Sequence, residues 1–415
     1  MTAPAAVKAY QALRGISPED MMDIVEGVSD LVKENAGVRR ITSYILSKGM
    51  DEDVLGLIMD MISTRKKAAA KFEKGEELYF TSEGLRWATP EAAAEHCARR
   101  MAGESVADIT CGQGGQVLSL ARHCDMVTAV DMDPLNCLIT SMNLKKSGLD
   151  GVTVYPENCF SRKVISGLEK GSLVFCDPAR PPGSKERTME EISPDPRKVL
   201  MEYGERISGA CFEMPPYMSL EKIPFDCEVE YVSLGGRINR MNLYTGSLKR
   251  SRRSAVVLPE GASISGDGSG INNDRPPEVT AGIWVNELDP AVSRSSLVGE
   301  LMLREGWTGR VVKLDPRRTL LWSDAPLDSP FVKESFRVLG TADSYEGVKR
   351  LLRSAGAGSV TIRYAVDPSD YWTIRNELER GLDGSIKVHL FKGETFIIGE
   401  KLMGSSSRSG GKGRQ

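Results

Sequence analysis

Apolar and polar positions follow two different periods along the chain, and the change of period divides it into regions. In residues 1–78, apolar side chains recur at i, i+3 and i+4, as in "DMMDIVEGVSDLVKENAG" and "DEDVLGLIMDMISTRKKAAAKF", which is typical of helices that bury one face. From 79 to 260, short apolar runs alternate with helical segments. This pattern predicts a mostly parallel sheet covered by helices, with strands at 105–109, 127–131, 152–155, 172–176 and 209–213.

The pattern changes again in the C-terminal half. Close-set strands after residue 226 predict an antiparallel hairpin that closes the sheet. Residues 261–278 are rich in Gly, Ser, Asn and Pro, which predicts a linker or long loop at the start of a connecting segment, 261–329. A small α/β domain is expected over 330–403, followed by a disordered tail, 404–415. Its predicted strands are 333–338, 358–364, 385–391 and 394–400, and its helices are 343–354 and 368–380.

The segment "VADITCGQGGQ" at 106–116 is the first candidate for chemistry. It combines the end of an apolar strand, a glycine-rich turn and the start of a helix. Glycine has no Cβ, so such a turn lets backbone approach a ligand closely. The next predicted strand ends at Asp131, nineteen residues after Gly112, where a carboxylate can accept both ribose hydroxyls of an adenosine ligand. The alternative is that Asp131 and Asp133 are helix N-terminal carboxylates.

Charge decides between the two adenosine cofactors that suit such a turn. A dinucleotide favours the fuller G-x-G-x-x-G spacing, whereas this chain has G-x-G-G. Asp108 stands four places before the first glycine, where a carboxylate repels pyrophosphate but attracts the ammonium of a methionine moiety. The sequence therefore favours S-adenosylmethionine (SAM) over NAD.

The third and fourth predicted strands add polar residues at the same sheet edge. In "PENCF", Asn158 can bond the adenine edge, or it can be a helix cap in an ordinary strand-to-helix turn. In "LVFCDPARPPG", the apolar run delivers Asp177 to the crevice, and Arg180 follows it. We expect Asp177 to orient the methyl acceptor and Arg180 to grip a substrate phosphate or to pair with Glu186 or Glu190.

Composition and charge restrict the class of protein. The chain has 415 residues, 40% of them hydrophobic and 27% charged, which is ordinary for a soluble protein, and we expect it to be cytoplasmic, with no membrane span. Its eight cysteines include no CxxC pair, so we expect reduced, buried thiols and no metal site. A net charge of −3 gives no global basic field. The local basic residues are Lys249, Arg250, Arg252 and Arg253, which could contact phosphates or be a solvated turn.

The motifs "DITCGQGGQ", "VDMDP", "ENCF" and "CDPARPP" resemble, in order and spacing, those of class I SAM-dependent methyltransferases. The resemblance implies an α/β, Rossmann-like SAM-binding domain over 79–260, beside the N-terminal helical domain. Three further stretches, "WVNELDPAVSRSSLVGEL", "SPFVKESFRVLG" and "VTIRYAVDPSDYWTIRNELE", are similar to the methyltransferases whose C-terminal domain is THUMP-like. "ATPEAAAEH" also resembles trimethylguanosine synthases, in which the Thr holds the methionine carboxylate; here Thr89 could equally be a helix cap. The resemblance implies a cofactor site made by Thr89, Asp108, Cys111, Gly112, Gly114, Asp131, Met132, Asn158 and Asp177.

The substrate expectation comes from the same resemblance. THUMP domains occur in RNA-modifying enzymes, so RNA is the expected partner, with the oligomeric state left open. The motif "DPAR" lacks the aromatic residue of the amino-methylating signature, because Ala179 and Arg180 stand there. Two alternatives therefore stay open: methylation of a protein or small metabolite, and a SAM-responsive RNA-binding protein without transfer activity.

Overall fold

A computed structural model describes residue 13 and residues 15–179, 189–268, 281–315 and 318–402. The chain forms two compact units. The first contains Met1–Cys227 and Asn242–Arg250, and the second contains Glu228–Met241 and Ser251–Gln415. The chain therefore passes from the first unit to the second and back before it enters the second unit for good. The predicted tail, 404–415, and Arg180 lie outside the described residues.

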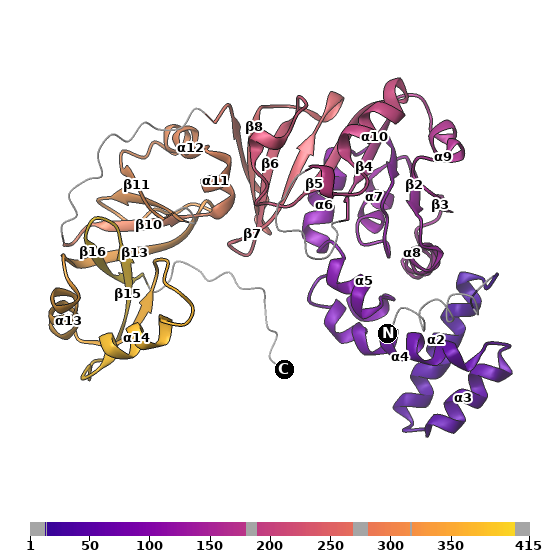
Figure 1. Cartoon of the computed structure of the whole chain (residues 1–415), viewed down its shortest axis with the longest axis horizontal. Helices are drawn as coiled ribbons and strands as arrows, with labels where there is room; N and C mark the ends of the chain where they lie inside the picture. Colours follow the sequence, from indigo (N-terminus) through magenta and orange to yellow (C-terminus); the bar gives the residue numbers. More distant parts are fainter. Residues whose placement is uncertain (1–12, 14, 180–188, 269–280, 316–317, 403–415) are drawn as a thin grey trace. The chain divides into compact units, whose positions relative to one another are not determined.

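The N-terminal region is helical, as its periodicity predicts. Helices α2 (Pro18–Lys33), α3 (Val38–Ser47) and α4 (Leu55–Ala68) lie together in Figure 1. Ser17 caps α2 by accepting a hydrogen bond from the Asp20 N–H, and Pro18 stands at the first helical position. The apolar faces of these helices share a buried cluster with Ile139 and Met142 of α8 (Pro134–Lys146). The helices are therefore packed on the helix that follows the second strand of the sheet.

The sheet of the first unit is parallel and has the strand order β3-β2-β1-β4-β5. The order reverses between β1 and β4, and the carboxyl ends of strands at such a reversal form the ligand crevice of open α/β sheets. All five strands that the sequence predicts are present: β1 (Ser105–Asp108), β2 (Met126–Asp131), β3 (Val152–Pro156), β4 (Ser172–Cys176) and β5 (Ile207–Met214). Helix α6 (Glu91–Arg100) precedes β1, and the helices between the five strands are α7 (Val117–His123), α8, α9 (Arg162–Gly167) and α10 (Pro196–Tyr203).

The strands after residue 226 include the predicted hairpin but differ from the prediction in two other ways. β6 (Glu228–Leu234) and β7 (Arg237–Tyr244) are joined by Gly235 and Gly236, whose positive φ angles of 59° and 70° suit a two-residue hairpin turn. β8 (Arg253–Leu258), however, pairs with β6 in parallel, so this part is not a simple antiparallel hairpin. The prediction of a loop over 261–278 is wrong for β9 (Ala262–Gly266), which pairs antiparallel with β8.

A seven-stranded sheet forms most of the second unit, in the order β11-β12-β10-β13-β16-β15-β14. The strands and helices predicted beyond residue 330 are present as β13 (Val332–Ala342), α13 (Tyr345–Ser354), β14 (Ala357–Ile362), α14 (Tyr371–Glu379), β15 (Ile386–Lys392) and β16 (Phe396–Lys401). The predicted connecting segment is itself folded in part. It supplies β10 (Trp284–Leu288), α11 (Pro290–Ser295), α12 (Val298–Glu305), β11 (Arg310–Asp315) and β12 (Arg318–Ser323).

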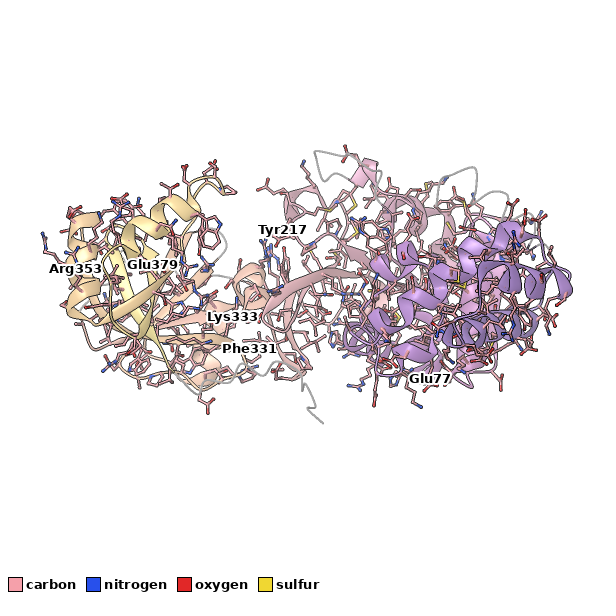
Figure 2. All side chains as sticks on the ribbon, turned by 90° about the horizontal axis from the view of Figure 1, so that it is seen from below. Glu77, Tyr217, Phe331, Lys333, Arg353 and Glu379 are labelled. Carbon is pink, nitrogen blue, oxygen red and sulfur yellow. The ribbon has the colours of Figure 1, made fainter. Side chains whose placement is uncertain are left out.

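A nearly buried carboxylate joins several strands of this second sheet. Glu287 in β10 lies 3.4 Å from Lys333 in β13. Figure 2 labels Lys333 and the buried Phe331, which lies just before this strand. The same carboxylate lies 3.4 Å from Arg318 and 3.3 Å from Arg363. A buried carboxylate is tolerated when cations compensate for its lost hydration, and here three cations surround it.

Candidate cofactor site

The glycine-rich turn lies between β1 and α7, at the edge of the sheet where the C-terminal ends of the parallel strands meet. Hydrogen bonds from Ile109 N–H to Phe175 O, 3.0 Å, and from Cys111 N–H to Val130 O, 2.9 Å, hold the turn between β4 and β2. Gly112 and Gly114 have φ angles of 52° and 91°, which other residues adopt only with strain. The positions of these two glycines therefore require glycine for backbone conformation alone.

Two side chains of helix α8 hold the turn by hydrogen bonds. The Thr140 hydroxyl donates to Gly112 O over 2.9 Å, and the Asn143 amide donates to Gln113 O over 3.0 Å. A Cβ at Gly114 would come within 3.3 Å of the Thr140 side chain. The turn is thus fixed in position by backbone and side-chain hydrogen bonds before any ligand enters.

Asp131 lies at the end of β2 and faces this turn. Its carboxylate accepts hydrogen bonds from Gly112 N–H (3.0 Å), Asp133 N–H (2.8 Å) and the Asn136 amide (3.3 Å). Burial raises the pKa of the carboxyl despite these hydrogen bonds. The Asp133 carboxylate instead caps α8, because it accepts the Leu135 N–H over 2.9 Å. The predicted helix-capping role is therefore seen at Asp133. Met132 between them is exposed, with 69% of its surface accessible.

Asp108 at the end of β1 is fully buried. One oxygen accepts the Thr110 N–H over 3.1 Å, and the other, Oδ2, has no hydrogen-bond partner among the described residues. Burial, together with the nearby carboxylates of Asp131 and Glu213, raises the pKa of this carboxyl to about 8. Glu213 belongs to the end of β5 and is a site residue that sequence reasoning missed. The only indication in the sequence was the position of Glu213, directly before "MPP" at the end of an apolar run.

Asp177 follows β4, and the structure ties its backbone to the turn. The Asp177 N–H donates to the Thr110 hydroxyl over 2.7 Å. Its side chain is half-buried, and the chain next pairs Ala179 with Ser193. The structure thus brings Asp108, Asp131 and Asp177 to one edge of the sheet, as predicted, whereas Arg180 lies outside the described residues.

Two other predicted cofactor residues have local structural roles. Asn158, after β3, is exposed, and its side chain accepts the Phe160 N–H over 2.8 Å within the turn. The prediction of Asn158 as a helix cap is wrong, because Ser161 is the N-cap of α9. Cys111 is buried in the turn, where a hydrogen bond with Cys137 and burial raise the pKa of its thiol. The described thiols are all free, and six of the eight are buried.

Thr89 lies beside the glycine turn on the segment between α5 (Ser82–Trp87) and α6. It is buried, and a Cβ at Gly115 would meet the Thr89 nitrogen at 3.3 Å. Gln113 of the turn is bonded on two sides. Its side chain accepts the Thr81 N–H at the start of α5 over 2.9 Å and donates to Asn136 of α8 over 3.2 Å. Pro90, rather than Thr89, takes the N-cap position of α6.

A lysine ammonium also holds this segment. Lys71 Nζ donates to the carbonyls of Leu85 (2.8 Å), Arg86 (3.0 Å) and Ala88 (2.7 Å). These carbonyls lie at the end of α5, where they have lost their helical partners. The ammonium therefore replaces a helix C-cap and fixes residues 85–88.

Replacement of Lys71 by methionine should lower the free energy of unfolding by on the order of 2 kcal/mol, because it leaves two partly buried carbonyls without a donor. Thermal unfolding followed by circular dichroism measures this. Lys67→Met on exposed α4 surface is the matched control, with an expected change below about 0.5 kcal/mol. Equal melting temperatures for the two variants would show that the ammonium holds nothing.

The four basic residues differ in their surroundings. Lys249 and Arg250 belong to the first unit, and Lys249 pairs with Asp226 at 2.5 Å. Arg252 and Arg253 belong to the second unit; Arg252 is exposed, and Arg253 is half-buried next to Gly268. Arg250 is exposed as well. Exposed cations are thus present on each unit at this point of the chain.

Two searches of the described residues gave negative results. No cluster of three or more His, Cys, Asp or Glu side chains there is arranged to hold a metal ion. Within the same ranges, every helix is too short or too polar to cross a membrane.

Comparison with known proteins agrees with the site. No family profile matches the chain. Two proteins from Mycobacterium tuberculosis strains (CDC 1551 / Oshkosh and ATCC 25618 / H37Rv), each named "Uncharacterized S-adenosylmethionine-dependent methyltransferase", are 28% identical over 298 residues, which is 70% of this chain and 78% of each relative. The crystal structure of a "putative methyltransferase" from Porphyromonas gingivalis W83 superposes with a TM-score of 0.72 over 94% of this chain and 100% of that one, at 13% identity.

Sheet order, glycine turn and these relatives together support SAM-dependent methyl transfer as the activity of this chain. Its cofactor is SAM. The residues present fit that molecule: the unpartnered oxygen of Asp108 suits a cation, Asp131 suits a ribose diol, and the glycines leave room for backbone contact.

Proposed function

We propose that this enzyme methylates RNA, with the cofactor held at the carboxyl edge of β1, β2 and β4. The cofactor half of the proposal depends on one observation, the placement of Asp108 and Asp131 on either side of the glycine turn. The RNA half is supported by the resemblance of residues 284–301, 329–340 and 360–379 to proteins with a THUMP-like domain. Arg250 and Arg252 are exposed to solvent, where a phosphate can reach them.

The cofactor supplies an electrophilic methyl carbon bonded to a sulfonium. When bound, the cofactor would give this methyl group to the acceptor and leave as its demethylated product, while the acceptor loses its proton. This chain contributes position: Asp177, tied to the turn by its N–H, accepts a hydrogen bond from the acceptor N–H or O–H and orients its lone pair. In this proposal Thr89 binds the methionine carboxylate, Met132 and Asn158 lie by the adenine, and Arg180 holds a substrate phosphate.

The test is transfer of labelled methyl from SAM in lysate of cells that lack the protein. We expect the purified enzyme to label the RNA fraction, with one methylated nucleoside restored in its digest and identified by mass spectrometry. Label in protein or small molecules alone would contradict the RNA substrate. Asp177→Ala should reduce labelling by about 100-fold even at saturating SAM, because it removes the group that orients the acceptor.

A further inference from the structure

A large aromatic side chain stands exposed next to the cofactor site. Trp87 is the last residue of α5, and 66% of its surface is accessible. An indole costs free energy to leave in water, and Trp is usually among the more buried residues. Its backbone is nevertheless held on both sides, because Lys71 bonds the carbonyls of Arg86 and Ala88. The exposure is thus a feature of a fixed segment.

The position of this segment relates Trp87 to the reaction. The residues immediately after Trp87 contact the turn: a Cβ at Gly115 would lie 3.4 Å from the Ala88 methyl and 3.3 Å from Thr89 N. Gln113 of the turn also bonds Thr81 at the start of the same helix. Trp87 is therefore two residues from a predicted cofactor ligand on a backbone that packs against the cofactor turn.

The surroundings of the ring indicate what it binds. The Arg86 guanidinium lies 4.9 Å from the ring centroid, so the pair offers an indole plane and a cation together. A stable protein partner needs roughly 800 Å² on each side, far more than one side chain supplies. A single unstacked nucleobase with its phosphate fits this pair, since bases stack on Trp and phosphates bind guanidinium.

We propose that Trp87 is the stacking platform for an unpaired base of the RNA substrate, beside the base that receives the methyl group, and that Arg86 contacts the adjoining phosphate. This inference rests on the proposed RNA substrate. It makes Trp87 a substrate-binding residue that acts on affinity for RNA and leaves cofactor binding unchanged.

The experiment compares Trp87→Ala, Trp87→Phe and wild-type protein in full-length form with saturating SAM. Binding of a fluorescein-labelled, mixed-sequence single-stranded RNA of ten nucleotides is followed by anisotropy, and SAM binding by calorimetry. We expect Trp87→Ala to weaken RNA binding by about 10- to 100-fold and Trp87→Phe by less than about fivefold, because phenylalanine keeps a stacking face. SAM affinity should stay within about twofold for both. Met126→Ala, an exposed residue at the opposite end of β2 from Asp131, is the control and should bind RNA as wild type does.

Each outcome separates the two proposals. RNA binding that survives in Trp87→Ala would overturn the stacking platform and leave the RNA substrate standing. Lost RNA binding accompanied by lost SAM binding would assign Trp87 to the cofactor site instead, which also overturns the platform. A wild-type protein that binds no RNA would overturn both.

Discussion

Replacing Asp131 with alanine is expected to weaken SAM binding by about 100-fold or more. The Asp131 carboxylate accepts the Gly112 N–H over 3.0 Å and lies where a ribose diol would reach it. Each hydrogen bond to a charged acceptor contributes about 1.5–3 kcal/mol, so the loss of two ribose contacts accounts for a change of this size. The measurement is isothermal titration calorimetry with SAM and with its demethylated product.

Asp133→Ala provides a matched control for this prediction. Asp133 is two residues away and is also acidic, but its carboxylate caps α8 through Leu135 N–H at 2.9 Å. Its replacement should cost about 1 kcal/mol of stability and leave SAM affinity within about threefold. If both variants bind SAM as wild type does, the carboxylate at the end of β2 does not hold the ribose, and the cofactor site must be placed elsewhere.

The strands and the glycine turn of this site could be predicted from the sequence, because each depends on residues that are close together in the chain. An apolar run of four or five residues makes a buried strand, and a positive φ angle needs glycine, as at Gly112 and Gly114. Once β1, β2 and β4 are parallel neighbours, their end residues Asp108, Asp131 and Asp177 must share one sheet edge. The sequence could not show which of Asp131 and Asp133 caps the following helix, whereas the hydrogen bonds assign the cap to Asp133 and join Asp131 to the glycine turn.

Contacts between distant segments were beyond sequence reasoning. Lys71 bonds carbonyls fourteen to seventeen residues away, and Gln113 bonds Thr81 thirty-two residues away. Nothing in the local pattern of either residue points to its partner. Strand β9 was missed for a related reason: "ASISG" has weak apolar character, and its pairing with β8 supplies the hydrogen bonds that make it a strand. Tertiary context decides such cases.

Replacing Asp108 with asparagine should make the protein more stable and a weaker SAM binder. The Asp108 carboxyl is fully buried, and one of its oxygens has no partner in the part of the chain that the structure describes. Its pKa in the folded protein is about 8, compared with 3.8 for an exposed aspartate. The unfolded chain releases this proton above about pH 4, whereas the folded chain holds it until about pH 8. Wild-type stability should therefore fall as pH rises from 4 to 8 through this group. Asparagine does not ionise, so at pH 7 the variant should gain on the order of 2 kcal/mol.

The same carboxyl gives cofactor binding a pH dependence. A cationic ligand favours the ionised form of Asp108, so wild-type affinity for SAM should rise with pH up to about 8 and binding at pH 7 should release a proton. Calorimetry in two buffers of different ionisation enthalpy measures that proton. Asp108→Asn should release none through this position and bind SAM about 10- to 100-fold more weakly at pH 8. Denaturant unfolding at pH 5 and pH 7 completes the test, because the stability gain of the variant should shrink as pH falls. A gain of the same size at both pH values would mean that Asp108 is ionised in the free enzyme and that its buried charge is compensated from elsewhere in the chain.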